Sequence, residues 1–575
     1  MTWTREAPRP AARGGAARGG AASGVDWLWV LAWGVASSVW CITAARQLSA
    51  TFDEPLYITR GLEGWRSGSH SGLIKLGTMP LPVDVCTLPL YLWERWHGTL
   101  LDPMSAMSSI LPWARAGTLL FWWVLLVYGW RIGWQLGGRW SGRLAVALLA
   151  GEPSLLAHAA LATTDIAVSA CLLALLYHFR TGRDAGWVPR VGLPAWWFAA
   201  CVLAKASGLL YAPICLVVVE VERVVRAGVP SSRAERSKAS TRDVAAVIGC
   251  GLVMVFVYCG TDWRAQPSFV AWAHGLPDTT INRGMVWLAE HLRIFGNAGE
   301  GIVRQVRHAI RGHSYGAYLL GGVRPGFWYY FPVALSIKLT LPLLFLPLVV
   351  LAVQPRALLN WATLAAAALL LFSLTSRVQI GVRFVLPLVA LAAVGIAAAV
   401  VRTCNACASK WSWQLLATGT AGAVVWTAAA AAAVWPEGLC YANELWGGTA
   451  RGYLYLSDSN YDWGQGLTEL RRWQEAHGAV ALDVWYFGTD PAVHRPPLRE
   501  MPLHVLQIAT SDDVAATVRG HWVAASTTLL YGAVMNPAHG AAAAFLRGRQ
   551  PVARTSTFFI YDFTQEPDSA AERKS

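Results

Sequence analysis

The chain has 575 residues, of which 55% are hydrophobic and only 14% are charged, and its mean hydropathy is +0.39. These values exclude an ordinary soluble globular protein and indicate a membrane protein. The net charge of +13 would suit nucleic acid, an anionic lipid surface or an anionic substrate. Because the arginines lie between apolar segments instead of on one basic face, we expect no nucleic-acid partner.

Residues 1–25 are rich in Arg, Gly and Ala and lack the apolar run of a signal peptide, so we expect a disordered cytoplasmic tail. Apolar stretches that could cross a bilayer, which takes about 20 residues, then recur as far as Trp435. We expect about eleven transmembrane helices, at residues 26–45, 112–131, 144–162, 166–180, 193–204, 207–223, 243–260, 331–353, 357–374, 383–401 and 413–435.

The positions of the basic residues predict the orientation of these helices. With a cytoplasmic N-terminus, the arginine-rich connections after the second, fourth and sixth spans all lie on the cytoplasmic side, as the positive-inside rule requires. The loops 46–111 and 261–330 then lie outside, together with everything from residue 436 onward. We therefore expect a membrane domain over residues 26–435 and an extracytoplasmic domain over residues 436–575.

The residues after Trp435 change in character. Helix-like segments alternate there with five strand-like ones: RGYLYLSDS, VALDVWYFG, LHVLQIATS, WVAASTTLLYG and TSTFFIYDF. We expect a small α/β domain in which parallel pairing is favoured. The predicted fold is a polytopic α-helical membrane protein that carries this domain on its outer face.

Acidic residues at two outer positions are candidates for chemistry. Asp53 and Glu54 follow the first span, and Asp165 lies where the chain turns between two later spans. Ionisable residues at a membrane boundary are functional candidates by default. The alternative is structural, since Asp53 suits the N-cap of a helix beginning near Pro55, and a threonine before Asp165 could cap the next helix.

Cations are expected on the same outer side. They are Arg115, Lys205, Lys338, Arg377 and Arg383. Such residues would hold the phosphate of a lipid-linked substrate while a carboxylate takes a proton from an attacking hydroxyl. Alternatively, some of them only reach toward the interface from within the membrane.

Several segments, in this order, resemble the GT-C glycosyltransferases, specifically the protein O-mannosyltransferase-like and aminoarabinose-transferase-like group. They are FDEPLYITRGLEGW, SLLAHAALATTDIAVSACLLALLYHF, LAKASGLLYAP, RGHSYGAYLLGG, FWYYFPVALSIKLTLPLLFL, SRVQIGVRFVLPL and ANELWGGTARGYLYLSDSNYDWGQGLTELRRW. The likeness covers most of the chain, and its specificity lies in the order and spacing of the segments.

The resemblance implies roles for individual residues. Asp53 matches the catalytic aspartate of the first outer loop, the expected base toward an acceptor hydroxyl, with Glu54 beside it. Asp165 matches the second acidic position, and Arg115 the arginine that contacts the lipid-linked phosphate. Asp458 and Asn460, in the segment DSNYDWGQ, would lie at the end of a strand, where α/β domains commonly bind ligands. An Asx-type turn is the plain alternative for them.

The sequence also departs from the pattern of this group. Met79 and Phe384 stand where related sequences have histidines, and DWGQDL has become DWGQGL, with Gly466. The two lost histidines argue against a histidine-bound metal. A divalent cation held by Asp53 and Asp165 stays an alternative.

The sequence thus predicts a glycosyltransferase of the inner membrane of a bacterium, with an inverting mechanism expected from the resemblance. It would transfer a hexose or pentose from a polyprenyl-phosphate sugar to the hydroxyl of a protein, lipid or glycan outside the cytoplasm. Two alternatives stay open: an inactive relative that acts as a membrane scaffold, and a transporter of lipid-linked sugars. The sugar, the acceptor and the length of the lipid are not determined by the sequence.

Overall fold

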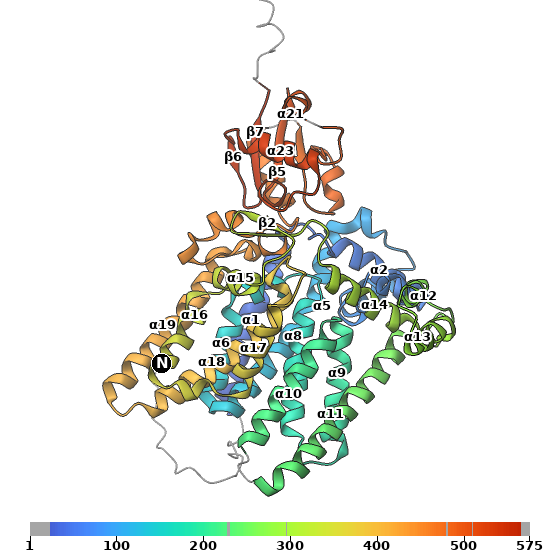
Figure 1. The fold of residues 1–575 in the computed structure, drawn as a ribbon. Coiled ribbons are helices and arrows are strands. Elements are labelled where there is room, and N and C mark those ends of the chain that lie inside the picture. Colours follow the sequence, from blue (N-terminus) through green and yellow to red (C-terminus); the bar gives the residue numbers. More distant parts are fainter. Residues whose placement is uncertain (1–22, 227–229, 295, 479–480, 509, 565–575) are drawn as a thin grey trace, which may run out of the picture.

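The structure is a computed structural model that describes residues 23–226, 230–294, 296–478, 481–508 and 510–564, with only the backbone described for residues 230–239. The expected N-terminal tail falls almost entirely outside these ranges. Figure 1 shows a bundle of long helices with a small α/β domain standing on one end of it. We refer to this end as the outer end.

The bundle helices follow the expected spans. They are α1 (Gly24–Ala45), α5 (Pro103–Gly137), α6 (Arg139–Gly151), α7 (Pro153–Ala159), α8 (Asp165–Thr181), α9 (Leu193–Ala204), α10 (Gly208–Arg226), α11 (Pro230–Cys259), α15 (Tyr330–Lys338), α16 (Leu341–Val353), α17 (Trp361–Ser373), α18 (Leu386–Ala406) and α19 (Lys410–Val434). In the described residues, five helices are long and apolar enough to cross a membrane, or up to six if α15 and α16 form one span. The chain is a multi-pass membrane protein, but this criterion does not reach the expected eleven spans.

The expected span 331–353 is not one straight helix, because α15 and α16 meet at 109°. Pro342 lacks the backbone N–H that a continuous helix would direct to the carbonyl of Lys338. That carbonyl instead accepts a hydrogen bond of 2.9 Å from Ser154 Oγ of α7. The break lies at the outer end of the bundle and leaves Lys338 at the end of α15.

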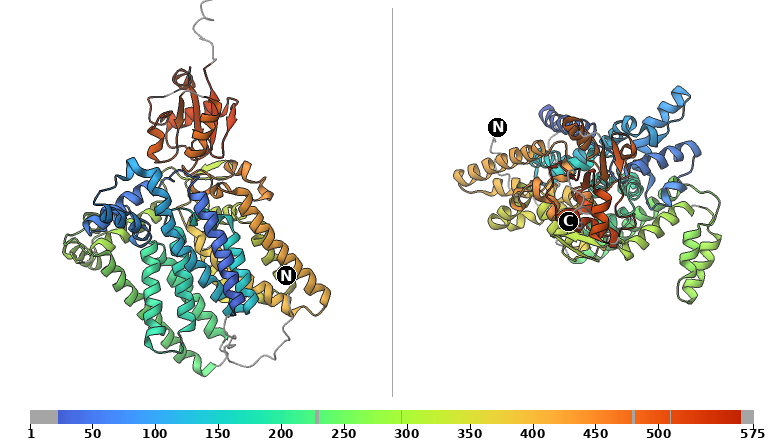
Figure 2. Two further views of the ribbon diagram at one scale, coloured as in Figure 1. Left: turned by 180° about the vertical axis from the view of Figure 1, so that it is seen from behind. Right: turned by 90° about the horizontal axis from the view of Figure 1, so that it is seen from above.

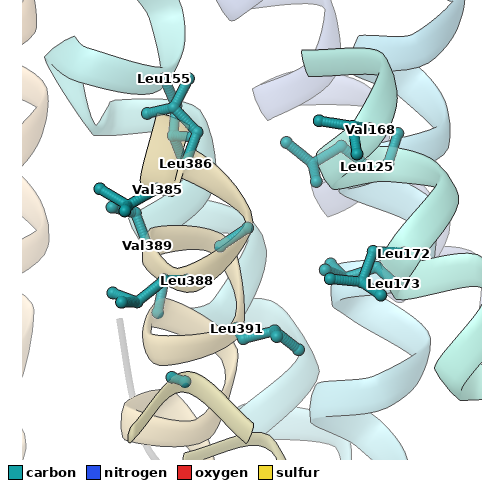
Figure 3. Close-up of a cluster of buried hydrophobic side chains, with 14 of the residues drawn as sticks. Leu125, Leu155, Val168, Leu172, Leu173, Val385, Leu386, Leu388, Val389 and Leu391 are labelled. Atoms are coloured by element: carbon teal, nitrogen blue, oxygen red, sulfur yellow. The ribbon is translucent and has the colours of Figure 1, made fainter. Parts of the chain in front are cut away.

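The core of the bundle is built on α8 and α18. The span that includes α18 is 89% buried inside the protein, and nearly every side chain of α8 is buried. Figure 3 shows apolar side chains of α5, α8 and α18 packed together, among them Leu125, Val168 and Leu386. Since both central helices begin at the outer end, this packing fixes the positions of Asp165 and Arg383, which lie at their starts.

Short helices and a hairpin cover the outer end of the bundle (Figures 1 and 2). Loop 46–111 contains α2 (Glu54–Ser67), α3 (Ser71–Ile74) and α4 (Pro80–His97). Loop 261–330 contains α12 (Pro267–His274), α13 (Thr280–His291), α14 (Gly296–Arg311) and the antiparallel strands β1 (Ala317–Leu319) and β2 (Gly322–Arg324). Both loops lie on the side of the α/β domain.

The C-terminal domain contains a five-stranded sheet in the order β4-β3-β5-β7-β6. Its strands are β3 (Leu482–Trp485), β4 (Leu498–Glu500), β5 (Trp522–Ser526), β6 (Ala553–Arg554) and β7 (Phe558–Asp562). Its helices are α20 (Leu467–His477), α21 (Ser511–Val518), α22 (Thr527–Tyr531) and α23 (Pro537–Arg547). The pairing is mixed: β3 runs parallel to β4 and β5, whereas β7 runs antiparallel to β5 and β6.

Two of the five expected strands are wrong. The segment RGYLYLSDS forms 3-10 turns, η6 (Thr449–Leu454) and η7 (Asp458–Asn460), because its backbone bonds locally and to the outer hairpin, where Leu320 N donates to Tyr455 O at 2.9 Å. The segment LHVLQIATS forms turns after Pro502 and contains no strand in its described residues. Alternating apolar residues mimic a strand in both segments, but neither backbone joins the sheet.

The C-terminal domain is bonded to the loop that precedes Asp53. The backbone N–H of Ala50 donates to Asp490 Oδ2 at 2.6 Å, and Phe52 N donates to the carbonyl of Trp463 at 2.9 Å. Thr489 Oγ1 donates to the carbonyl of Phe52 at 2.7 Å. The outer domain therefore fixes the backbone on which the first acidic candidate stands.

Candidate active site

Asp53 occupies the N-cap position of α2, but its side chain makes no capping hydrogen bond. Its Oδ2 instead accepts from Arg383 Nη1 at 2.8 Å and from the hydroxyl of Tyr57 at 3.3 Å. The side chain of Asp53 is 23% exposed, whereas those of Glu54 and Asp165 are 0% exposed. Among the three acidic candidates, Asp53 is thus the most exposed, and the capping alternative does not apply to it.

Glu54 has a different environment from its neighbour. Its carboxylate forms two hydrogen bonds with Arg115, of 2.8 and 2.7 Å, and accepts the backbone N–H of Ala162 at 2.7 Å and of Thr51 at 2.9 Å. Burial alone would raise the pKa of Glu54, but the charge and hydrogen bonds of Arg115 outweigh it and hold this pKa below its usual value. Glu54 is therefore an ionised structural group that joins the outer loop to two helices.

Arg115 uses every N–H of its guanidinium within the protein. Besides Glu54, it donates to the carbonyls of Ala45, Leu48 and Ser49 at 2.7 to 2.9 Å. A guanidinium has five N–H donors, and all five are engaged here. In this conformation no donor is left for a lipid-linked phosphate, so the structure gives Arg115 the role of holding the end of α1 against the outer loop.

Asp165 and Lys205 form the second ion pair of the site. Lys205 Nζ, at the end of α9, lies 2.5 Å from Asp165 Oδ1. The preceding threonine, Thr164, is the N-cap residue of α8 and makes no capping bond with its side chain. His158 approaches from α7, with its Nδ1 3.9 Å from Asp165 Oδ2. A carboxylate, an ammonium and an imidazole from three helices thus meet at one point.

Arg383 lies at the centre of the site, beside Asp53 and two aromatic rings. Its guanidinium carbon is 4.2 Å from the ring centre of Trp463 and 5.1 Å from that of Phe384. Lys205 Nζ lies 4.3 Å from the same Phe384 ring. Both cations thus contact aromatic faces, which favour positive charge. Phe384 thus holds two cations in place.

Lys338 and Arg377 are placed away from this centre. Lys338 is buried, and its ammonium donates to the carbonyls of Leu439, Tyr441 and Asn460 at 2.6 to 2.8 Å, which uses all three of its donors. Arg377 is exposed and donates to the carbonyl of Ile310 at 3.2 Å. Of the five expected cations, the structure brings Lys205 and Arg383 to the accessible carboxylate.

The segment Asp458–Gln465 links the membrane part to the outer domain. Asn460 accepts from the backbone of Val382 at 2.8 Å and donates to the hydroxyl of Tyr330 at 2.9 Å. The Asp458 side chain bonds the N–H of Ser459 at 2.6 Å, in a tight turn. Asn460 is therefore a structural link, and the expectation of a strand edge is replaced by a 3-10 turn.

Asp458 nevertheless lies near the charged centre. Burial raises the pKa of its carboxyl to about 7, although the positive charge of Arg383 opposes this shift. Its φ of +57° is in the left-handed region, which is uncommon for a residue other than glycine. Asp458 also lines a cavity of about 30 Å³ between the membrane part and the outer domain. Strained residues of this kind cluster at functional sites.

Sequence reasoning missed three aromatic residues of the site: His158, His313 and Trp463. Burial, with the charges of His308 and Arg383, lowers the pKa of His313 to about 4, so this side chain is neutral near pH 7. All three stand inside segments that carry the family resemblance, which was the available signal. Their side chains could not be placed near Asp53 without the fold, because they come from three separate parts of the chain.

The described residues contain no group of three or more His, Cys, Asp and Glu side chains that could hold a metal ion. Asp53 and Asp165, the expected pair for a divalent cation, are each already paired with a cation of the chain. Met79 is buried, and its sulfur lies beside Gly301 of α14. At Gly466 an added Cβ would lie 1.9 Å from Thr557 Oγ1, so this packing has no room for an aspartate.

The fold and the site define a multi-pass membrane protein with a charged cluster at the outer ends of its helices. No protein-family model and no curated protein matches the chain. Solved structures similar to it include ArnT from Cupriavidus metallidurans bound to undecaprenyl phosphate, at 15% identity and a TM-score of 0.43, covering 94% of this chain and 98% of that one. Another is the oligosaccharyltransferase AglB from Archaeoglobus fulgidus with an inhibitory peptide and a dolichol-phosphate, at 12% identity and a TM-score of 0.44, covering 95% and 76%. Because these sequence identities and TM-scores are low, the proposed function is argued from the geometry of the site.

Proposed function

We propose that the chain is a membrane glycosyltransferase of the GT-C type. It would transfer one hexose or pentose from a polyprenyl-phosphate donor to an acceptor hydroxyl at the extracytoplasmic face of a bacterial inner membrane. The observation that carries this proposal is the accessible Asp53, paired with Arg383 beside the pair of Lys205 and Asp165. A base next to two cations is the arrangement that displacement of a phosphate requires.

In the proposed reaction, Asp53 removes the proton of the acceptor hydroxyl as its oxygen attacks the anomeric carbon of the sugar. The bond between that carbon and the phosphate oxygen breaks, and polyprenyl phosphate leaves with one more negative charge. A single displacement of this kind inverts the configuration at the anomeric carbon. Arg383 and Lys205 stabilise the charge that develops on the phosphate.

The pairing of Asp53 with Arg383 couples removal of the acceptor proton to departure of the phosphate. While Asp53 is ionised, its carboxylate neutralises the guanidinium. When Asp53 takes the acceptor proton, Arg383 loses its counter-ion and is free to attract the phosphate as its charge grows. The site needs no additional cation for this exchange, because the chain supplies the positive charge.

The test is turnover by the purified chain in lipid nanodiscs with a panel of undecaprenyl-phosphate sugars, monitored as release of undecaprenyl phosphate. Asp53→Asn should lower the rate by on the order of a hundredfold to ten-thousandfold, the usual contribution of a general base. Cooperative thermal unfolding of the variant would show that the loss of rate is not a loss of the fold. Wild-type rates in Asp53→Asn would refute the assignment.

The same assay separates the alternatives. A transporter would move the labelled lipid across the bilayer without cleaving it, and an inactive scaffold would do neither. The described helices place their ionisable residues at the two ends of the bundle. Transporters more often place such residues at mid-membrane. This placement favours the transferase.

A further inference from the structure

Two buried atoms of the site face each other without a hydrogen bond. His158 Nδ1 and Asp165 Oδ2 are 3.9 Å apart, and neither has a hydrogen-bond partner within the described parts of the chain. Their side chains are 2% and 0% exposed. Buried polar atoms in folded proteins are nearly always paired, so two such atoms at one point require an explanation.

Two other histidines of the fold are bonded within the protein, whereas Nδ1 of His313 in the outer loop, like that of His158, has no partner in the described residues. The ring of His178, on the inner half of α8, bonds the hydroxyl of Tyr128 at 2.8 Å. His539 in the outer domain bonds both the N–H of Met535 and the carbonyl of Leu529. These two rings are satisfied by the protein. His158 is as buried as His539, but its Nδ1 has no partner in the described structure.

The separation of the two atoms suits one bridging oxygen. An oxygen atom can lie about 2.8 Å from each of two atoms that are 3.9 Å apart, which is a normal hydrogen-bond distance on both sides. A carboxylate only accepts, so the bridging group must donate to Asp165. It can then accept from His158 when Nδ1 carries the proton. A hydroxyl does both with one proton and one lone pair.

Charge excludes other groups from this position. A phosphate oxygen has no proton to offer the carboxylate and would be repelled by it. An ammonium group would lie close to Lys205, whose Nζ is 2.5 Å from the other oxygen of Asp165, and near Arg383. A neutral hydroxyl is the group that these surroundings accept.

The position also lies beside the proposed chemistry. The ring of His158 is 6.4 Å from that of Trp463, and the guanidinium of Arg383 lies over the same indole, bonded to Asp53. A sugar held here would have its neighbouring atoms close to the base and to the cations that attract its phosphate. The pair thus stands where the transferred group must be oriented.

We propose that His158 and Asp165 together bind one hydroxyl of the transferred sugar and so fix the orientation of its ring toward Asp53. This inference rests on the proposed transferase function. It makes His158 a binding residue for the sugar, distinct from the cations that bind the phosphate. The ligand class is a neutral, hydroxyl-bearing pyranose or furanose.

The test compares two lipids on the full-length chain in nanodiscs: undecaprenyl phosphate, and those undecaprenyl-phosphate sugars that the wild type transfers. His158→Ala should weaken binding of the sugar-linked lipid by about tenfold or more, the effect of losing a hydrogen bond in a buried charged pair. Binding of undecaprenyl phosphate should not change. His158→Asn should recover most of the loss, because its side-chain amide reaches the place of Nδ1, whereas His158→Gln should not.

His178→Asn is the control, since it alters a half-buried histidine of the same bundle away from the site, and it should change neither affinity. Equal loss of both lipids in His158→Ala and His158→Asn would overturn the inference and show a structural role. Unchanged affinity for the sugar-linked lipid in His158→Ala would overturn it as well. A wild-type chain that transfers no sugar would instead overturn the proposed function, and the inference with it.

Discussion

At the scale of single residues, Arg383 balances the negative charge of Asp53. It faces Asp53 at 2.8 Å on one side and the indole of Trp463 on another, at the start of the most buried span. A lysine at this position would keep the charge but not the planar shape that stacks on the ring. A lysine at position 383 therefore separates the contribution of the positive charge from that of the planar guanidinium.

Arg383→Gln should lower turnover by on the order of a hundredfold to a thousandfold, as the loss of one donor to a developing anion does. Arg383→Lys should recover part of the rate, because it restores the charge without the stacking. The measurement is kcat with a donor that the wild type uses. Arg60→Gln, which alters an exposed arginine of α2, should leave kcat unchanged. Full activity in Arg383→Gln would contradict the proposed role.

Asp458 makes stability depend on pH. Its pKa is raised by burial from 3.8 to about 7 in the folded protein, so the folded state binds more protons than the unfolded state between these values. Stability from this group is therefore present at low pH and is lost as the pH rises toward 7. Asp462, at about 6, and Glu437, at about 8, act in the same direction.

The asparagine of Asp458→Asn cannot ionise. The thermal stability of this variant should therefore fall less than that of the wild type as the pH rises through this range. The gain of the variant over the wild type should grow from pH 4 to about 7 and stay constant above it. Melting temperatures of both proteins across the range provide the measurement. A constant difference between the two proteins at every pH would show that Asp458 does not titrate in this way.

At the scale of elements, one ion pair joins the first outer loop to the bundle. Glu54 and Arg115 connect the start of α2 to α5, the end of α1 and the turn before α8. Both side chains are fully buried and fully bonded. Asp53 precedes Glu54 directly, so the position of the proposed base depends on this pair.

Glu54→Gln should lower the free energy of unfolding by about 3 to 5 kcal/mol, because it leaves the charge of Arg115 buried without its partner. Glu63→Gln is the matched control on the same helix. Its exposed pair with Arg60 should contribute less than about 1 kcal/mol. Unfolding by titration with sodium dodecyl sulfate would measure both variants. Equal effects of the two substitutions would contradict the structural role of the buried pair.

The elements that the sequence predicted best are those with a simple local pattern. Long apolar runs gave the helices of the bundle, and short, mostly apolar runs gave β3, β5 and β7. The 109° break between α15 and α16 was missed, because an apolar run does not show where a helix bends. The segments RGYLYLSDS and LHVLQIATS alternate as strands do, but long-range contacts of the first and turns in the second decide their structure.

The charged residues were predicted less completely. Asp53, Asp165, Lys205 and Arg383 were candidates from their types and positions, and the fold brings them together. Arg115 and Lys338 were indistinguishable from them in sequence, because only the fold shows that their donors are used by backbone carbonyls. Trp463 stands 80 residues beyond Arg383, and no local pattern could pair them.

For the molecule as a whole, the outer domain and the membrane part form one site. The domain bonds the backbone of Ala50 and Phe52 through Asp490 and Thr489. The same loop carries Asp53, whose partner Arg383 lies on the membrane part. Orientation of the base thus depends on contacts between residues more than 400 positions apart.

The double variant Asp490→Ala with Thr489→Val should loosen this loop. We expect faster hydrogen exchange over residues 49–54 and a lower kcat, with the bundle still folded. Asp512→Asn, on the exposed start of α21, is the control and should change neither. Unchanged exchange over residues 49–54 in the double variant would show that the outer domain does not fix this loop.

The passage of Trp463 from the outer segment into the charged centre has a consequence for engineering. A chimera that exchanged everything after Trp435 for the tail of another protein would also replace the surface against which Arg383 is stacked. Such an exchange would alter catalysis. The functional boundary between the two parts therefore does not lie at the end of the last apolar helix.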